Sequence, residues 1–184
     1  LPIYPIARVA TTASGERVAF DLASLDIGSQ PDMTMPGANA HATGVKPVEA
    51  FLAWWDSVRE RARRGEVGRI AVVGGGAGGT EVVLAMRHRL ASDGSSARIA
   101  LVSDRSNLPA AAKRALLAAL DAAQVELHLG SGAAAFDDGG VVLASGARVD
   151  TDEVACATPA TAAPWLAASG LACDARGFVR IDEH

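Results

Sequence analysis

The sequence has few cysteines and lacks any long hydrophobic run. Its 184 residues include only Cys156 and Cys173, which excludes a disulfide framework. The sequence also lacks a Cys-x-x-Cys motif, which excludes a redox-active disulfide formed within such a motif. No apolar stretch approaches the roughly 18 residues that span a bilayer, and the first residues lack the features of a signal peptide. We therefore expect no transmembrane segment and a cytoplasmic protein.

Positive charge is scarce as well. Seventeen Lys and Arg residues stand against 21 Asp and Glu, a net charge of −4. Nucleic-acid binding surfaces usually carry a basic excess, so we expect no nucleic-acid partner. The four histidines share no metal-ligand spacing, and no Ser/His/Asp or Cys/His arrangement is recognisable. The sequence thus predicts no metal site, and its catalytic residues are unknown.

The composition fits a folded domain. Apolar residues make up 49% of the chain and charged residues 21%, enough apolar material for a hydrophobic core. The length corresponds to about one domain, or one domain and a piece of another.

The most informative segment runs from Gly68 to Leu90. Ile70 to Val73 has the β-branched content of a buried strand, and the six positions after it, Gly74–Gly79, hold five glycines. A helical pattern of apolar residues follows, ending at Leu90. Strand, glycine turn and helix form the context in which a G-x-G-x-x-G motif indicates dinucleotide binding.

Each glycine of the motif has a physical reason. Gly74 allows a tight turn, Gly76 lets a pyrophosphate approach the main chain, and Gly79 lets the helix pack close to the strand. The helix N-terminus then offers N–H groups to the phosphates. The candidate cofactor-binding residues in this loop are Gly74, Gly75, Gly76, Ala77, Gly78 and Gly79. The alternative is a glycine-rich turn in a degenerate Rossmann unit that binds nothing.

The rest of the chain predicts further elements. Before the glycine loop we expect a hairpin (Ile3 to Ala10 with Arg17 to Phe20), a buried strand (Leu22 to Ser29), a loop (28–47) and a helix (Pro47 to Arg64). The apolar face of that helix comprises Val48, Phe51, Leu52, Trp55 and Val58. After the loop we expect a strand (Ile99 to Val102), a helix (Ala110 to Ala123), a strand (Val125 to Leu129), a meander of short strands (134–149), a strand (Glu153 to Thr158) and a last strand (Phe178 to Ile181).

This order predicts an α/β fold. A β-α-β-α-β unit followed by a meander and one more strand gives a Rossmann-like parallel sheet, with helices on one face and the β-meander on the other.

Three stretches carry a family resemblance. Phe20–Ser29 (FDLASLDIGS) resembles the strand that ends the first half of an FAD domain, and Val72–Glu81 (VVGGGAGGTE) resembles the nucleotide loop of an inserted NAD(P)H domain. Residues 152–182 resemble the strand, turn and return into the FAD domain. Together they are similar to the pyridine nucleotide-disulfide oxidoreductase superfamily of FAD/NAD(P)-binding flavoproteins. The branch with type II NADH:quinone dehydrogenases, sulfide:quinone reductases and the flavoprotein module fused to selenide, water dikinase is the one suspected.

The resemblance implies a division of the chain and a function. Residues 1–45 are a remnant of the FAD domain, 46–66 a connecting helix, 67–158 the NAD(P)H-binding Rossmann domain and 159–184 the return segment. The family's FAD loop and late Gly-Asp motif are missing, so we expect a partial chain whose partners are a nicotinamide nucleotide and the remainder of the FAD domain. A homodimer is left open.

In the complete protein, NAD(P)H would pass a hydride to FAD and on to an unknown acceptor, with quinone as one candidate. The enzyme would then be peripheral to a membrane if the acceptor is a quinone, and the fragment alone would be inactive. The alternative is a non-catalytic nucleotide-binding or docking Rossmann module, or a structural remnant, fused to another enzyme.

Several positions depart from the family pattern. An acid is expected at the end of the second strand for the ribose 2′-OH, where the chain has Ser103, Asp104 and Arg105. Because serine and arginine could instead accommodate a 2′-phosphate, NAD and NADP both stay open.

The remaining departures lie in the turn and the helix. Pro159 replaces the glycine of an Ala-Thr-Gly turn after Thr158, and Ala85 replaces the second acid of a quinone-reductase pattern whose first acid is Glu81. Glu81 either contacts the cofactor or favours the helix dipole. Asp26 is either an acid near the flavin or a strand-end residue bonded to the backbone.

Overall fold

The computed structural model of the chain describes residues 3–4, 7–12, 14–104 and 113–181. The chain divides into two compact units, one made of residues 1–30 and 160–184 (unit 1) and one of residues 31–159 (unit 2). Each unit is described by itself below.

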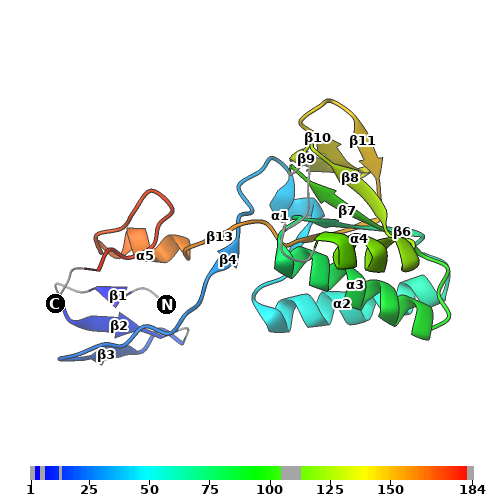
Figure 1. The fold of residues 1–184 in the computed structure, drawn as a ribbon. Coiled ribbons are helices and arrows are strands. Elements are labelled where there is room, and N and C mark those ends of the chain that lie inside the picture. The colour runs from blue at the N-terminus through cyan, green and yellow to red at the C-terminus, as the bar shows by residue number, and fades with distance from the viewer. Residues whose placement is uncertain (1–2, 5–6, 13, 105–112, 182–184) are drawn as a thin grey trace. The chain divides into compact units, whose positions relative to one another are not determined.

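Unit 2 contains a five-stranded sheet in the order β5-β12-β6-β7-β8 (Figure 1). All four strand pairings are parallel. The strands are β5 (Thr43–Gly44), β12 (Glu153–Cys156), β6 (Arg69–Val73), β7 (Arg98–Ser103) and β8 (Glu126–Leu129). The predicted Rossmann-like α/β fold is confirmed.

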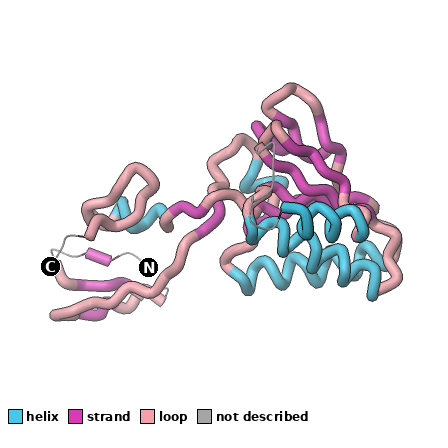
Figure 2. Tube along the Cα trace, viewed as in Figure 1, coloured by secondary structure: helices cyan, strands magenta, loops and turns pink. Residues whose placement is uncertain are grey.

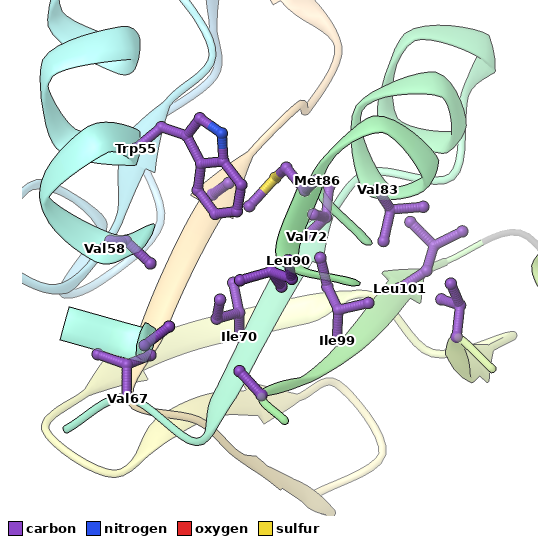
Figure 3. Packing of buried hydrophobic residues seen from close by; sticks show 14 of the residues in the cluster. Trp55, Val58, Val67, Ile70, Val72, Val83, Met86, Leu90, Ile99 and Leu101 are labelled. Carbon is purple, nitrogen blue, oxygen red and sulfur yellow. The ribbon is translucent and has the colours of Figure 1, made fainter. Parts of the chain in front are cut away.

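Helices cover one face of this sheet, as Figure 2 shows. They are α2 (Val48–Arg63), α3 (Ala77–Ser92) and α4 (Lys113–Ala122). In Figure 3 Trp55 and Val58 of α2 and Met86 of α3 lie over the sheet residues Ile70 and Val72. Alternate residues of a strand point to opposite faces, so these sheet residues belong to the helical side.

A β-meander covers the opposite face. Its strands β9 (Ala133–Asp137), β10 (Gly140–Leu143) and β11 (Arg148–Asp150) are antiparallel in the order β11-β10-β9. Ala71, Val73, Ala100 and Val102 pack against it in a second buried cluster, which also contains Ala38 of the short helix α1 (Ala38–His41). The prediction of helices on one face and a meander on the other is confirmed.

The face of α2 was predicted only in part. Trp55, Val58 and Ala62 are buried, but Val48 and Leu52 are each 51% exposed. Trp54, which is not part of the predicted face, donates from Nε1 to Glu153 Oε2 at 2.9 Å. The contact surface is therefore turned toward the side of the helix that meets β12.

Unit 1 is built from short elements. Strands β1 (Ile3–Tyr4), β2 (Val9–Thr11) and β3 (Arg17–Ala19) form an antiparallel sheet. The predicted hairpin is confirmed for β2 and β3, but the expected strand Ile3 to Ala10 is wrong, because β1 and β2 are separate strands that pair with each other. The pair β4 (Gln30–Pro31) and β13 (Ala160–Thr161) is followed by helix α5 (Pro164–Ala168).

Several expected elements are wrong. Leu22 to Ser29 forms no strand, and Leu22 is 91% exposed, because no described strand lies beside this segment to complete a ladder. Phe178 to Ile181 is reduced to a single bridge between Cys173 and Val179. The expected loop 28–47 contains α1, β4 and β5.

The limits of two other elements differ from expectation. The last strand of the sheet ends at Cys156, two residues earlier than expected. Residues 110–112 of the expected helix Ala110 to Ala123 lie outside the described residues. No helix among the described residues is long and apolar enough to cross a membrane.

Candidate functional site

Gly74 makes the turn at the end of β6. Its φ is +128°, a backbone conformation that favours glycine, and a β-carbon there would lie 2.2 Å from the carbonyl oxygen of Ala157. The N–H of Gly74 donates to the carbonyl oxygen of Val102 at 2.9 Å. The chain therefore leaves the strand between the ends of β12 and β7, where a side chain has no room.

Gly79 lies in the first turn of α3. A β-carbon on it would lie 1.8 Å from the carbonyl oxygen of Gly74 and 3.3 Å from the β-carbon of Ala157. Thr80 is fully buried and donates from Oγ1 to the carbonyl oxygen of Gly76 at 2.9 Å. The helix thus begins in direct contact with the strand end, as the motif predicts.

Gly76 is different, because a β-carbon there would meet no atom within 4 Å. It is the N-cap of α3, with φ −71° and ψ 177°, and it has no side-chain cap. The fold itself does not demand glycine at this position. Open space beside the uncapped end of a 16-residue helix is what an approaching phosphate group requires.

Ser103, at the end of β7, packs against the loop. It is only 2% exposed, and a β-carbon on Gly75 would lie 2.3 Å from its Oγ. The next residue, Asp104, is exposed and lies beside Gly132, where a β-carbon would be 3.0 Å from the Asp104 β-carbon. Arg105 lies outside the described residues. Of the two described candidates, the acid is the one open to solvent.

Thr158 and Pro159 are hydrogen-bonded to the loop that contains Asp32, a contact that the sequence does not predict. Thr158 Oγ1 donates to the carbonyl oxygen of Asp32 at 2.8 Å, and the N–H of Asp32 donates to the carbonyl oxygen of Pro159 at 3.2 Å. Proline is compatible with this turn because its carbonyl, and not an N–H, makes the contact. The Asp32 carboxylate accepts from the N–H and Oγ1 of Thr34 at 2.9 and 2.7 Å.

These residues surround a pocket of about 170 Å³. It lies where β6, β7 and β12 end, the place where open parallel sheets bind ligands. Its lining includes two carboxylates, Asp32 and Asp104, and no described cation. The lining residues are Asp32, Met35, Val73, Gly74, Val102, Ser103, Asp104, Gly132, Ala133, Thr158 and Pro159.

The structure brings together only part of the predicted set. Gly74, Ser103, Asp104 and Thr158 line the pocket, and the remaining loop glycines lie beside it at the start of α3. Glu81 is exposed on α3 and does not line the pocket. Sequence reasoning missed Asp32, although Asp-x-Thr after a proline is typical of a side-chain-bonded turn.

Cys156 offers no nucleophile to this site. The thiol is fully buried, and burial raises its pKa to about 12. Since the thiolate is the reactive form, this thiol is unreactive, and the cysteine packs as a small apolar residue. No group of three or more metal-ligating side chains is found among the described residues.

A parallel sheet with a glycine turn, a helix beginning at that turn and a pocket at the strand ends defines a Rossmann-type domain of the nucleotide-binding class. The chain belongs to the pyridine nucleotide-disulphide oxidoreductase family, whose model matches residues 6–184. Oxidoreductases of this family use FAD and NAD(P)H, so the predicted superfamily and its cofactors are confirmed.

Solved structures share the fold. Reduced CoADR-RHD of Bacillus anthracis matches with a TM-score of 0.72 and 21% identity, covering 96% of this chain and 33% of that one. The ferredoxin reductase for the CYP199A2 system of Rhodopseudomonas palustris matches with a TM-score of 0.72 and 18% identity, covering 95% and 43%.

The sulfide:quinone oxidoreductase of Aquifex aeolicus matches with a TM-score of 0.72 and 16% identity, covering 97% of this chain and 46% of that one. This chain therefore spans less than half the length of each of the three structures. No curated protein matches the sequence.

Proposed function

We propose that residues 67–158 are the NAD(P)H-binding domain of an FAD-dependent oxidoreductase. In the whole protein NAD(P)H supplies a hydride that FAD accepts and passes to an acceptor, for which quinone is one candidate. The contribution of this chain is to bind and orient the nucleotide at the strand ends of β6 and β7.

The observation that carries the proposal is the contrast between Gly76 and the other two glycines of the G-x-G-x-x-G motif, Gly74 and Gly79. Gly74 and Gly79 are explained by the fold, because a β-carbon at either would collide with a backbone oxygen. At Gly76 a β-carbon would meet nothing within 4 Å. A glycine that the fold does not need, at the start of a helix and beside a pocket, is explained by a pyrophosphate that must approach the main chain.

The position of Asp104 supports a ribose contact. Ser103 is buried against Gly75, whereas Asp104 is exposed and lines the pocket. An exposed carboxylate at the end of the second strand can accept from the ribose 2′-OH and repels a 2′-phosphate. We therefore propose NADH as the preferred nucleotide, with Asp104 in the role expected of the strand-end acid.

The proposal assigns the remaining segments to an FAD domain. Residues 1–45 and 159–184 would be parts of it, joined to the nucleotide domain through 46–66. Leu22, Leu25 and Ile27 are 91%, 40% and 43% exposed within unit 1. An apolar run of this kind left open to solvent is explained if further sequence of the parent protein pairs with it.

Binding of NADH to the 184-residue chain tests the proposal. Calorimetry should show weak binding that Gly76→Ala abolishes without changing the melting temperature. Gly68→Ala is the matched control, because a β-carbon there would meet only Asp152 Oδ2 at 3.7 Å. Equal affinity of the Gly76→Ala and wild-type chains would contradict the binding mode.

The parent protein provides the test of catalysis. It should purify with bound FAD, and its flavin absorbance should bleach on addition of NADH. Tight NADH binding by the fragment, together with a flavin-free parent, would instead support a non-catalytic nucleotide-binding module.

A further inference from the structure

A second cleft lies at the opposite edge of the sheet in unit 2. It has a volume of about 260 Å³ and lies between the beginnings of β6, β7 and β8 and strand β11 of the meander. The glycine loop is at the other ends of these strands, so the two sites share no lining residue. The cleft is lined by Arg69, Ile70, Arg98, Ile99, Ala100, Glu126, His128, Arg148, Val149, Asp150 and Thr151.

Two of its arginines are neighbours by strand register. Arg69 begins β6, Arg98 begins β7, and the two are paired in the parallel ladder. Ala71, two positions after Arg69, and Ala100, two positions after Arg98, both pack under the meander. Because residues two apart in a strand point to the same face of the sheet, both arginines lie on the meander face. Adjacent like charges at the start of two paired strands repel each other, and an anion between them relieves that repulsion.

The carboxylates of the cleft are already engaged by other groups. Asp150 accepts from Arg148 Nε at 3.2 Å and lies 3.8 Å from Arg69 Nη1. Glu126 Oε1 is 2.8 Å from His128 Nε2. Arg148 is held by both carboxylate oxygens of Asp137, which lies outside the cleft lining.

Arg98 is the arginine of the cleft whose side chain has no partner among the described residues. It has neither an ion pair nor a side-chain hydrogen bond with any residue that the structure describes, and it is exposed. Arg69 has only the long contact to Asp150. The cleft contains three arginines and two acids, so its charge is positive although the whole chain has a net charge of −4.

We propose that this cleft binds the phosphate or carboxylate group of a small metabolite, with Arg98 and Arg69 as its anchors. A guanidinium presents a planar fork of donors that matches either oxyanion. Ala100 and Val149, which belong to the buried cluster on the meander side, supply apolar side chains next to the arginines for the rest of such a molecule. The site is separate from the nucleotide pocket and does not rest on the proposed function.

The test is a titration of the ¹⁵N-labelled 184-residue chain with inorganic phosphate, followed by backbone amide shifts at constant ionic strength. The amides of Arg69, Arg98 and residues 148–151 should shift and saturate. Arg98→Gln should weaken this binding by about tenfold or more, because a charge-assisted hydrogen-bond pair is lost. Arg114→Gln, an exposed arginine of α4 remote from the lining, should leave it unchanged.

A parallel titration with citrate separates a phosphate site from a carboxylate site, and saturation by either anion supports the proposal. The glycine-loop amides, Gly74 to Gly79, report the nucleotide site in the same spectra. Shifts confined to that loop, or the same affinity in Arg98→Gln as in the wild type, would overturn the cleft proposal while leaving the proposed function intact.

Discussion

Gly79, in the first turn of α3, lies directly against the carbonyl group of Gly74 at the end of β6. An added β-carbon would be 1.8 Å from that oxygen, and neither backbone can move without separating helix from sheet. Gly79→Ala should therefore lower the free energy of unfolding by about 3 kcal/mol, measured by urea denaturation. Gly78→Ala, where a β-carbon meets nothing within 4 Å, should be neutral or slightly stabilising. Equal losses in both variants would argue against this packing.

Asp104 should determine the choice of nucleotide. Replacing Asp104 with Asn removes the carboxylate that accepts a hydrogen bond from the ribose 2′-OH and repels a 2′-phosphate. The affinity for NADH should therefore fall about tenfold, while the affinity for NADPH should be retained or rise. Calorimetry with both nucleotides measures the change, and Asp121→Asn, an exposed acid on α4, serves as the control. A wild-type chain that prefers NADPH would refute the assignment.

Two buried threonines should respond in opposite ways to valine. Thr151 is 6% exposed, and its Oγ1 has no hydrogen-bond partner among the described residues, whereas Thr80 Oγ1 donates to Gly76. Thr80→Val should cost about 1 kcal/mol of unfolding free energy, while Thr151→Val should be neutral or stabilise by about 1 kcal/mol. Urea unfolding of the pair gives the comparison. A loss in Thr151→Val as large as that in Thr80→Val would mean that the Thr151 hydroxyl is bonded.

Asp137 should resist protonation. Hydrogen bonds from Arg148, and then from the N–H of Gly139, lower its pKa from 3.8 to about 2. Because the folded pKa is below the unfolded one, this carboxylate stabilises the fold above about pH 4, and the contribution is lost as pH falls toward 2. A carbon-detected NMR titration should show the low pKa, and Arg148→Gln should raise it toward the ordinary value. An unchanged pKa in that variant would exclude Arg148 as the cause.

Local sequence pattern was sufficient for strands β6, β7, β8 and β12, for helices α2, α3 and α4 and for the glycine turn of unit 2, but not for β5 and α1, which lie in the expected loop. Both faces of the sheet are covered, so Ile70 to Val73 and Ile99 to Val102 are apolar on both faces. In the sequence such strands are visible as continuous apolar runs. The structural requirements for Gly74 and Gly79 likewise follow from how a strand turns directly into a helix.

Features that depend on distant partners could not be predicted in this way. The bond from Thr158 to Asp32 joins residues far apart in sequence, and the burial of Ser103 is decided by where Gly75 lies. Leu22 to Ser29 has the composition of a buried strand, yet composition does not show whether a neighbouring strand is present. The exposure of Val48 and Leu52 similarly follows from how α2 is oriented on β12.

Strand β12 determines when unit 2 can become complete during synthesis. It is inserted between β5 and β6, although it follows both of them and the whole meander in the sequence. Until Glu153 to Cys156 have left the ribosome, β5 has no partner strand, and the edge of β6 stays open. Pairing of such late and early segments is slow compared with local structure. The nascent domain therefore spends most of its translation with an unfinished sheet edge, a period in which a chaperone could shield it.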